Sequence, residues 1–132
     1  MIDLEVDIFD SIYQLVTAEY PDAYVSSRVV AVPASFPAVS IVESSNVEYM
    51  PDGGDAERFS AVTYTVNVYS NAGSDGKEEC KAIAGIVSAR MRFMNFSRTM
   101  CEPVDNAADP SIYRMVLRFT GAVSDDGLTY RR

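Results

Sequence analysis

The segment from Arg58 to Asn71, RFSAVTYTVNVYSN, contains the longest regular alternation of apolar and polar residues in the chain. In an extended strand, one face would carry Val62, Tyr64, Val66 and Val68, and the other would carry Ala61, Thr63, Thr65 and Asn67. Its β-branched and aromatic residues fit the pleated surface of a sheet. The segment therefore predicts a central strand with one apolar face and one wet or polar-packed face.

A helix is predicted immediately after this strand. Turn-forming residues from Ser70 to Ser74 end the strand. From Lys77 to Asn95 the apolar residues recur at spacings of three and four, so one helical stripe holds Cys80, Ile83, Val87, Met91 and Met94. Asp75 and Glu78 suggest a capping box at its start. We expect this stripe to pack on the apolar face of the central strand.

The remaining elements follow from similar patterns. Apolar spacing predicts a first helix from Ile2 to Tyr20, which Pro21 ends. Strands are predicted at Ser27 to Val32, Ala38 to Tyr49, Phe96 to Glu102, Ile112 to Val123 and, briefly, Leu128 to Tyr130. The order α-β-β-β-α-β-β with short connections predicts an α+β fold: one domain over 1–132 with an antiparallel-dominated sheet and both helices on one face.

Length and charge limit the classes of function. A chain of 132 residues suits one domain. It contains no apolar run of the ~20 residues that cross a bilayer, and no basic segment precedes Asp3, so we expect neither a membrane span nor a secretory signal. The net charge of −8 argues against binding to a nucleic acid backbone. The two cysteines, Cys80 and Cys101, are expected to be small buried side chains in a reducing compartment.

No catalytic or metal-binding pattern is visible. The chain has no histidine, which excludes Ser-His-Asp and Cys-His catalysis. Gly53-Gly54 lacks the lysine and the strand-helix context of a phosphate-binding loop. Asp52, Asp55 and Glu57 do not follow the spacing of a calcium loop and are expected to form an acidic hairpin tip in water. The sequence therefore predicts no enzyme, no cofactor and no structural metal.

The basic residues form a pattern of their own. Arg114 and Arg118 share one face of a predicted strand, and Arg131 and Arg132 end the sequence, while the acids Asp52, Asp55 and Glu57 occupy a distant turn. One interpretation is a solvated strand face and tail. The other is a head-to-tail interface in which these arginines meet the acids of a neighbouring copy and close a ring.

Six segments of the sequence, in this order and spacing, carry a resemblance to a known family. They are Phe36–Glu43 with Asn46, Val66–Asn71, Gly76–Lys77, Phe96–Arg98, Asp109–Arg114 and Leu128–Arg132. Together they resemble the small tail-terminator or minor capsid proteins of long-tailed bacteriophages and prophages. The resemblance spans 36–132, with the first helix in the expected place, although the acidic turn at 50–57 has no clear counterpart in the family.

The resemblance implies a non-enzymatic virion protein made in the bacterial cytoplasm. Such a protein forms a hexameric ring on the tail tube, stops tail polymerisation and presents a surface to the head-tail connector. Six copies at −8 would give a ring of −48, and an acidic lumen would let DNA pass without binding it.

Two other functions fit the same residues. A connector or completion protein on the head side of the particle would have the same sequence features. A small-ligand-binding α+β module, with Thr63, Thr65 and Asn67 lining a pocket, is the alternative from another class.

Overall fold

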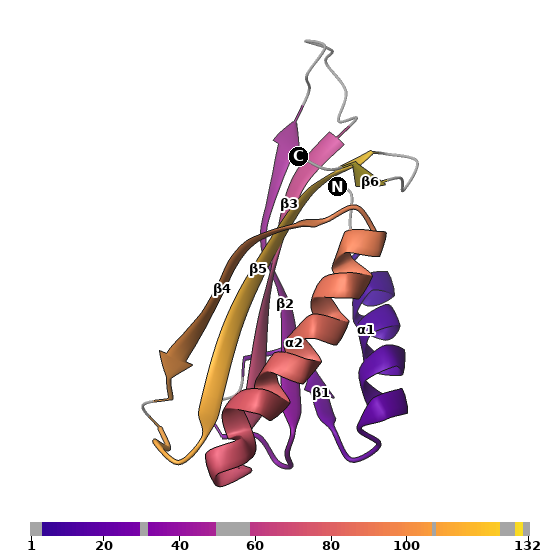
Figure 1. Cartoon of the computed structure of the whole chain (residues 1–132). Helices are drawn as coiled ribbons and strands as arrows, with labels where there is room; N and C mark the ends of the chain where they lie inside the picture. Colours follow the sequence, from indigo (N-terminus) through magenta and orange to yellow (C-terminus); the bar gives the residue numbers. More distant parts are fainter. Residues whose placement is uncertain (1–3, 30–31, 50–58, 107, 125–128, 131–132) are drawn as a thin grey trace.

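Two long strands, β2 (Ala38–Tyr49) and β3 (Phe59–Ser70), form the middle of the molecule (Figure 1). The computed structural model describes residues 4–29, 32–49, 59–106, 108–124 and 129–130. The other elements are α1 (Glu5–Glu19), β1 (Tyr24–Ser26), a 3-10 turn (Gly73–Asp75), α2 (Gly76–Phe93), β4 (Ser97–Asp105), β5 (Tyr113–Ser124) and β6 (Thr129–Tyr130).

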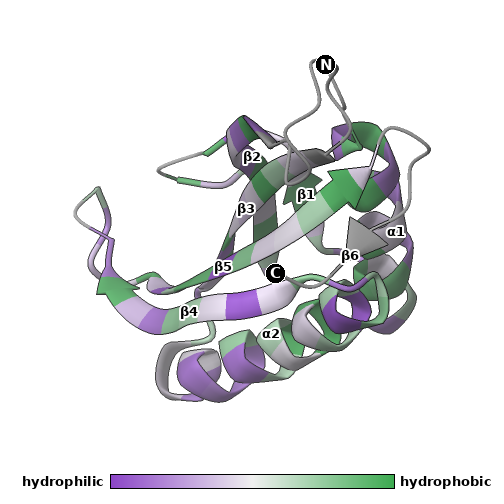
Figure 2. Ribbon diagram, turned by 90° about the horizontal axis from the view of Figure 1, so that it is seen from above, coloured by the Kyte–Doolittle hydropathy of each residue, from purple (hydrophilic) through white to green (hydrophobic). Residues whose placement is uncertain are grey.

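The strands form one sheet in the order β1-β2-β3-β5-β4, with β6 also paired to β5. Every pairing is antiparallel except that of β1 with β2. Both helices lie on the same side of the curved sheet (Figure 2). The predicted α+β architecture and element order are therefore confirmed.

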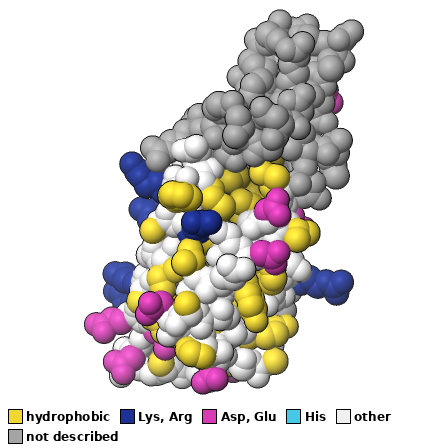
Figure 3. All heavy atoms as spheres, turned by 90° about the vertical axis from the view of Figure 1, so that its right-hand side faces the viewer, with side chains coloured by type: hydrophobic (Ala, Val, Ile, Leu, Met, Phe, Trp, Pro, Cys, Tyr) yellow, Lys and Arg dark blue, Asp and Glu magenta, His cyan; other side chains and the backbone are white. Residues whose placement is uncertain are grey.

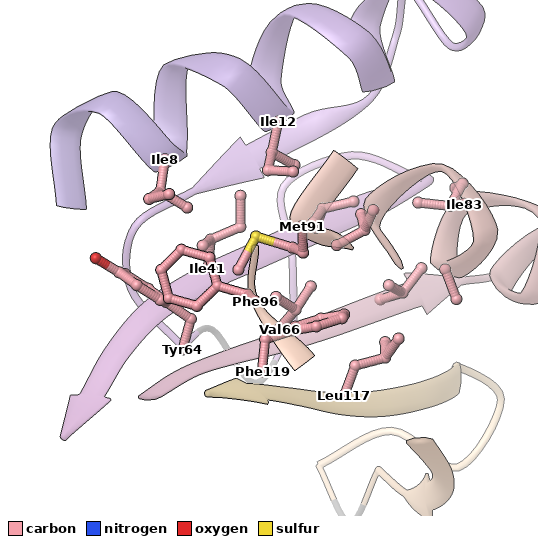
Figure 4. Packing of buried hydrophobic residues seen from close by; sticks show 14 of the residues in the cluster. Ile8, Ile12, Ile41, Tyr64, Val66, Ile83, Met91, Phe96, Leu117 and Phe119 are labelled. Atoms are coloured by element: carbon pink, nitrogen blue, oxygen red, sulfur yellow. The ribbon is translucent and has the colours of Figure 1, made fainter. Parts of the chain in front are cut away.

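The core lies between the helices and one face of the sheet (Figure 4). Val62, Tyr64, Val66 and Val68 of β3 are buried there with Cys80, Ile83, Val87 and Met91 of α2, while Met94 packs at the margin. Ile8, Ile12 and Val16 of α1 and Leu117 and Phe119 of β5 complete the same cluster. The predicted packing of the helix stripe on the apolar strand face is confirmed.

The predicted strand at 27–32 is wrong at residues 27–29 and 32, none of which belongs to a strand, while residues 30 and 31 lie outside the described part of the chain. The strand β1 lies just before it, at Tyr24–Ser26, where the Tyr24 amide donates to the Pro37 carbonyl. The hydroxyl of Ser26 then accepts from the Arg28 amide at 3.0 Å, and the chain bends at Ser27 and Arg28 instead of extending. β-branched composition at 29–32 suggested a strand, but a local side-chain hydrogen bond ends the pairing first.

The two ends of α2 differ in how they are capped. Asp75 occupies the N-cap position, but its side chain makes no capping hydrogen bond, so the predicted capping box is wrong. At the other end Asn95 has a φ of 68°, its amide donates to the Arg92 carbonyl, and the Phe96 amide donates to the Met91 carbonyl. This is a Schellman motif with asparagine at the left-handed position, and it turns the chain sharply from α2 into β4.

The edge strand β4 departs from prediction in two ways. It continues to Asp105 rather than ending at Glu102, and Pro103 is accommodated because only one side of this strand is hydrogen-bonded in the part of the sheet that the structure describes. Cys101 is exposed rather than buried. It pairs with Leu117 on the helix-facing side, but β4 lies at the margin of the sheet, beyond the strands that α2 covers most fully.

Candidate functional site

The described part of the predicted basic cluster lies on the sheet face opposite the helices. Arg114 and Arg118 of β5 pair in register with Tyr69 and Thr65 of β3. The Arg114 Nε donates to the Asn67 Oδ1 at 2.9 Å, and its guanidinium lies 5.6 Å from the centroid of the Tyr69 ring. Arg114 is therefore held partly buried by its own chain, whereas Arg118 is exposed.

This arrangement rests on a second, smaller core. Tyr69 is buried with Ala38 and Ile112, and Tyr24 and Phe36 pack against them. The expected polar packing of this face is confirmed at Asn67, which is almost fully buried. Arg114 thus contributes to local packing through its contacts with Asn67 and Tyr69.

The other members of the predicted interface belong to segments that the structure does not describe. Asp52, Asp55, Glu57, Arg131 and Arg132 lie outside the described residues. Their contact with the β5 arginines of a neighbouring copy stays a prediction.

A second basic surface, which sequence reasoning missed, lies where α2 turns into β4. A hollow of about 360 Å³ opens between these elements, lined by Ser88, Ala89, Arg92, Phe96, Ser97, Arg98 and Phe119. Both arginines are exposed, and the Arg98 Nη1 donates to the Ser88 Oγ at 3.4 Å. Lys77 and Lys81 follow the same side of α2.

The Schellman turn creates this surface. It reverses the chain between Arg92 and Arg98, so the last turn of the helix and the first residues of the strand lie against each other. The sequence signal for this turn is Asn95, which follows a helical pattern and precedes a strand pattern. An asparagine in that position predicts a tight reversal of the chain, which would bring the basic residues on either side of it together.

The surface of α1 has the opposite charge. Between Glu5 and Glu19 the sequence holds Glu5, Asp7, Asp10 and Glu19 and no lysine or arginine. Its solvent-facing side also exposes apolar groups: Val6 is 71% exposed and Tyr13 is 46% exposed. Figure 3 shows the face of the molecule on which α1 lies, where hydrophobic side chains are mixed with acidic and some basic ones.

The start of α1 is joined to the sheet through carboxylates. Glu5 Oε2 accepts from the Glu43 backbone amide at 3.0 Å, on the edge of β2 beyond its pairing with β1. The Glu43 side chain in turn accepts from the Tyr64 hydroxyl at 3.3 Å. These contacts fix the position of α1 over β2 and leave Asp7 and Asp10 exposed.

A larger hollow of about 650 Å³ lies at the β4–β5 hairpin, lined by Gly73, Pro103, Val104, Asp105, Asn106, Pro110, Ser111, Ile112, Tyr113 and Arg114. Nearby, hydrogen bonds from the Ser111 hydroxyl and amide lower the pKa of Asp109. Thr63, Thr65 and Asn67, the residues expected to line a ligand pocket, line neither hollow. Their side chains bond to Thr120, Ser44 and Arg114.

Within the described residues, no three Cys, Asp or Glu side chains are grouped as a metal site would require. Among the described helices, none is both long and apolar enough to cross a membrane. Comparison of the sequence with protein-family models and with curated proteins found no match.

Proposed function

We propose that this protein is a structural subunit of a long-tailed bacteriophage or prophage, in which copies form a ring that caps the tail tube. The ring, expected to be a hexamer, stops tail polymerisation and presents a surface to the head-tail connector. The sequence resemblance over 36–132 suggests this role, and the protein is then a component of the virion without enzymatic activity.

The distribution of charge is the observation that supports ring formation best. The charged residues of α1 are all acidic, and this helix packs over β2 at one side of the sheet. Arg92 in the last turn of α2 and Arg98 in β4 lie at the other side. A ring of identical subunits needs two different and complementary surfaces on each copy. The acidic helix α1 and the arginine pair at Arg92 and Arg98 are two such different surfaces.

The order of the sheet adds to this support. Among the described residues, β4 pairs with β5 alone, and β2 beyond Ser40 pairs with β3 alone. Ser44, Ser45, Val47 and Glu48 of β2 are all exposed. An edge strand such as β4 and the exposed residues of β2 are suited to contacts with other chains.

The test is the mass of the purified protein, followed by its effect on tail tubes. We expect light scattering to give a ring mass, negative-stain images to show closed rings, and the rings to stop elongation when added to polymerising tube protein. A monomer or dimer at every concentration would instead favour the small-ligand module. Rings that bind the head-side connector but leave tube elongation unchanged would favour a head completion protein.

The arginines predicted from sequence can be tested in the same assays. Changing Arg114, Arg118, Arg131 and Arg132 together to glutamate should lower the assembly mass. The four changes are combined because a single exposed ion pair contributes only ~0–1 kcal/mol. Since Arg114 also contacts Asn67 and Tyr69, Arg118→Glu with the two terminal changes is the matched variant that spares this packing. Unchanged rings in that triple variant would mean that these arginines form only a solvated surface.

A further inference from the structure

The hollow between α2 and β4 has the chemistry of a carboxylate-binding site. Arg92 and Arg98 stand at its rim, Ser88 and Ser97 add hydroxyl groups, and Phe96 and Phe119, each about 1% exposed, form part of its lining. Two guanidinium groups beside hydroxyl donors favour carboxylates. A volume of about 360 Å³ can admit a few side chains but not a folded element.

The outward side of α1 carries the matching groups. Val6, Asp10 and Tyr13 are spaced i, i+4 and i+7, so they form one stripe of the helix, and Asp7 adjoins it. All four side chains are exposed. The stripe therefore offers carboxylates beside apolar groups, and α1 has no basic residue that would oppose docking.

Within one copy these two surfaces cannot meet. α1 packs on α2 from the side where Arg90 donates to the Ser11 hydroxyl, whereas the hollow opens on the other side of α2, against β4. Figure 1 shows α1 and β4 on opposite sides of α2. A contact between the surfaces must therefore join two copies, and because the surfaces differ it joins them head to tail.

We infer that the Arg92–Arg98 hollow receives the outward stripe of α1 from a second copy of this chain, with Asp7 and Asp10 facing the two arginines. This inference rests on the proposed function, since it specifies which surfaces close the ring. In the arrangement each copy adds its α1 to the helical layer of its neighbour, next to α2.

Charge exchange tests the contact directly. One variant carries Arg92→Glu and Arg98→Glu, a second carries Asp7→Arg and Asp10→Arg, and a third carries all four changes. All four side chains are exposed, so circular dichroism should show folded proteins with similar melting temperatures. We expect each double variant to raise the dissociation constant for assembly by about tenfold or more, and the fourfold variant to recover most of that loss.

Lys77→Glu with Lys81→Glu is the matched control, because it makes the same charge change on the same side of α2. Lys81 is 11 residues from Arg92, roughly 16 Å along the helix, which exceeds the screening length of about 8 Å at physiological salt. Rings should persist in this variant. Loss of assembly in the control equal to that in the arginine variant would overturn the assignment to the hollow.

The outcomes separate this inference from the proposed function. If the wild type forms rings that cap tubes while the double variants assemble normally, or the fourfold variant fails to recover, the inference is wrong and the proposed function stands. If rings follow the charge exchange but never cap tubes, the docking is right and the tail role is wrong. A wild type that stays monomeric would overturn both.

Discussion

Two neighbouring residues of β3 provide a sharp test of the sheet's two faces. Val66 is fully buried on the helix-facing side, where it pairs with Ile41 and Leu117, and both of those are also buried. Thr65 lies on the opposite side, partly exposed and paired with Arg118. The same substitution to aspartate should therefore have very different effects at the two positions.

The expected magnitudes follow from burial. Val66→Asp loses about 1.5–3 kcal/mol of side-chain burial and adds at least ~1–3 kcal/mol for an unpaired polar group in the core. A total near 4 kcal/mol is a large part of the roughly 5–15 kcal/mol that holds a domain together. At about 3–5 °C per kcal/mol for this chain length, the melting temperature should fall by about 15 °C or more.

Thr65→Asp should lower the melting temperature by no more than about 5 °C. It removes one hydrogen bond, from the Thr65 hydroxyl to the Ser44 Oγ at 2.9 Å, and places a carboxylate beside Arg118. Val66→Ala should fall between the two, because it removes two methyl groups at ~0.8 kcal/mol each and leaves a cavity. Thermal and urea denaturation followed by circular dichroism measure all three. Equal losses at Thr65 and Val66 would refute the assignment of faces.

Three further predictions concern separate parts of the molecule. Burial, reinforced by the Glu79 carboxylate, raises the pKa of the Cys80 thiol to about 12. In a Cys101→Ser background we therefore expect a thiol reagent to label the native protein slowly and the unfolded protein fully. The free energy of unfolding should also fall as the pH rises from about 9 to about 12, because the thiol of the unfolded chain ionises first. Gly85→Ala should raise the free energy of unfolding by about 0.5–1 kcal/mol, because its added Cβ meets open space. Gly76→Ala should lower it, because the added Cβ would lie 3.2 Å from the Cβ of Tyr113. Chemical denaturation measures both changes. Millimolar Ca²⁺ should leave the melting temperature unchanged, and a clear rise would contradict the prediction that the acids at 50–57 bind no metal.

Predictions from sequence were most accurate where one short segment contains the whole signal. The alternation in Arg58 to Asn71 placed β3 to within one residue at each end, and the apolar spacing after Lys77 identified the buried side of α2. Both signals are local, because an exposed or buried side is repeated every two residues in a strand and every three to four in a helix. The acids and arginines of the candidate interface, by contrast, lie on segments far apart in the sequence, so no short segment predicts that they meet.

Errors occurred where a specific hydrogen bond or a neighbour in space, rather than the periodic pattern, decided the result. Val29 and Val32 belong to a strand-like pattern, but the hydrogen bonds of Ser26 end the strand before them. Cys101 has the apolar character of a core residue, but its exposure depends on how far α2 extends over the sheet. Arg114 and Arg118 share a strand face as predicted, yet Asn67 and Tyr69 hold only one of them.

By itself, the sequence determined most of the segments that form helices and strands, the apolar sides of β3 and α2, and that the chain is acidic. These properties follow from the periodicity of side chains along a regular backbone and from composition. Only the tertiary structure decided that β4 forms the sheet edge, that Arg92 and Arg98 border one hollow, and that this hollow and the acids of α1 lie on opposite sides of α2. The physical reason is that strand order and helix placement depend on long-range packing, which brings together residues whose separation along the chain carries no signal.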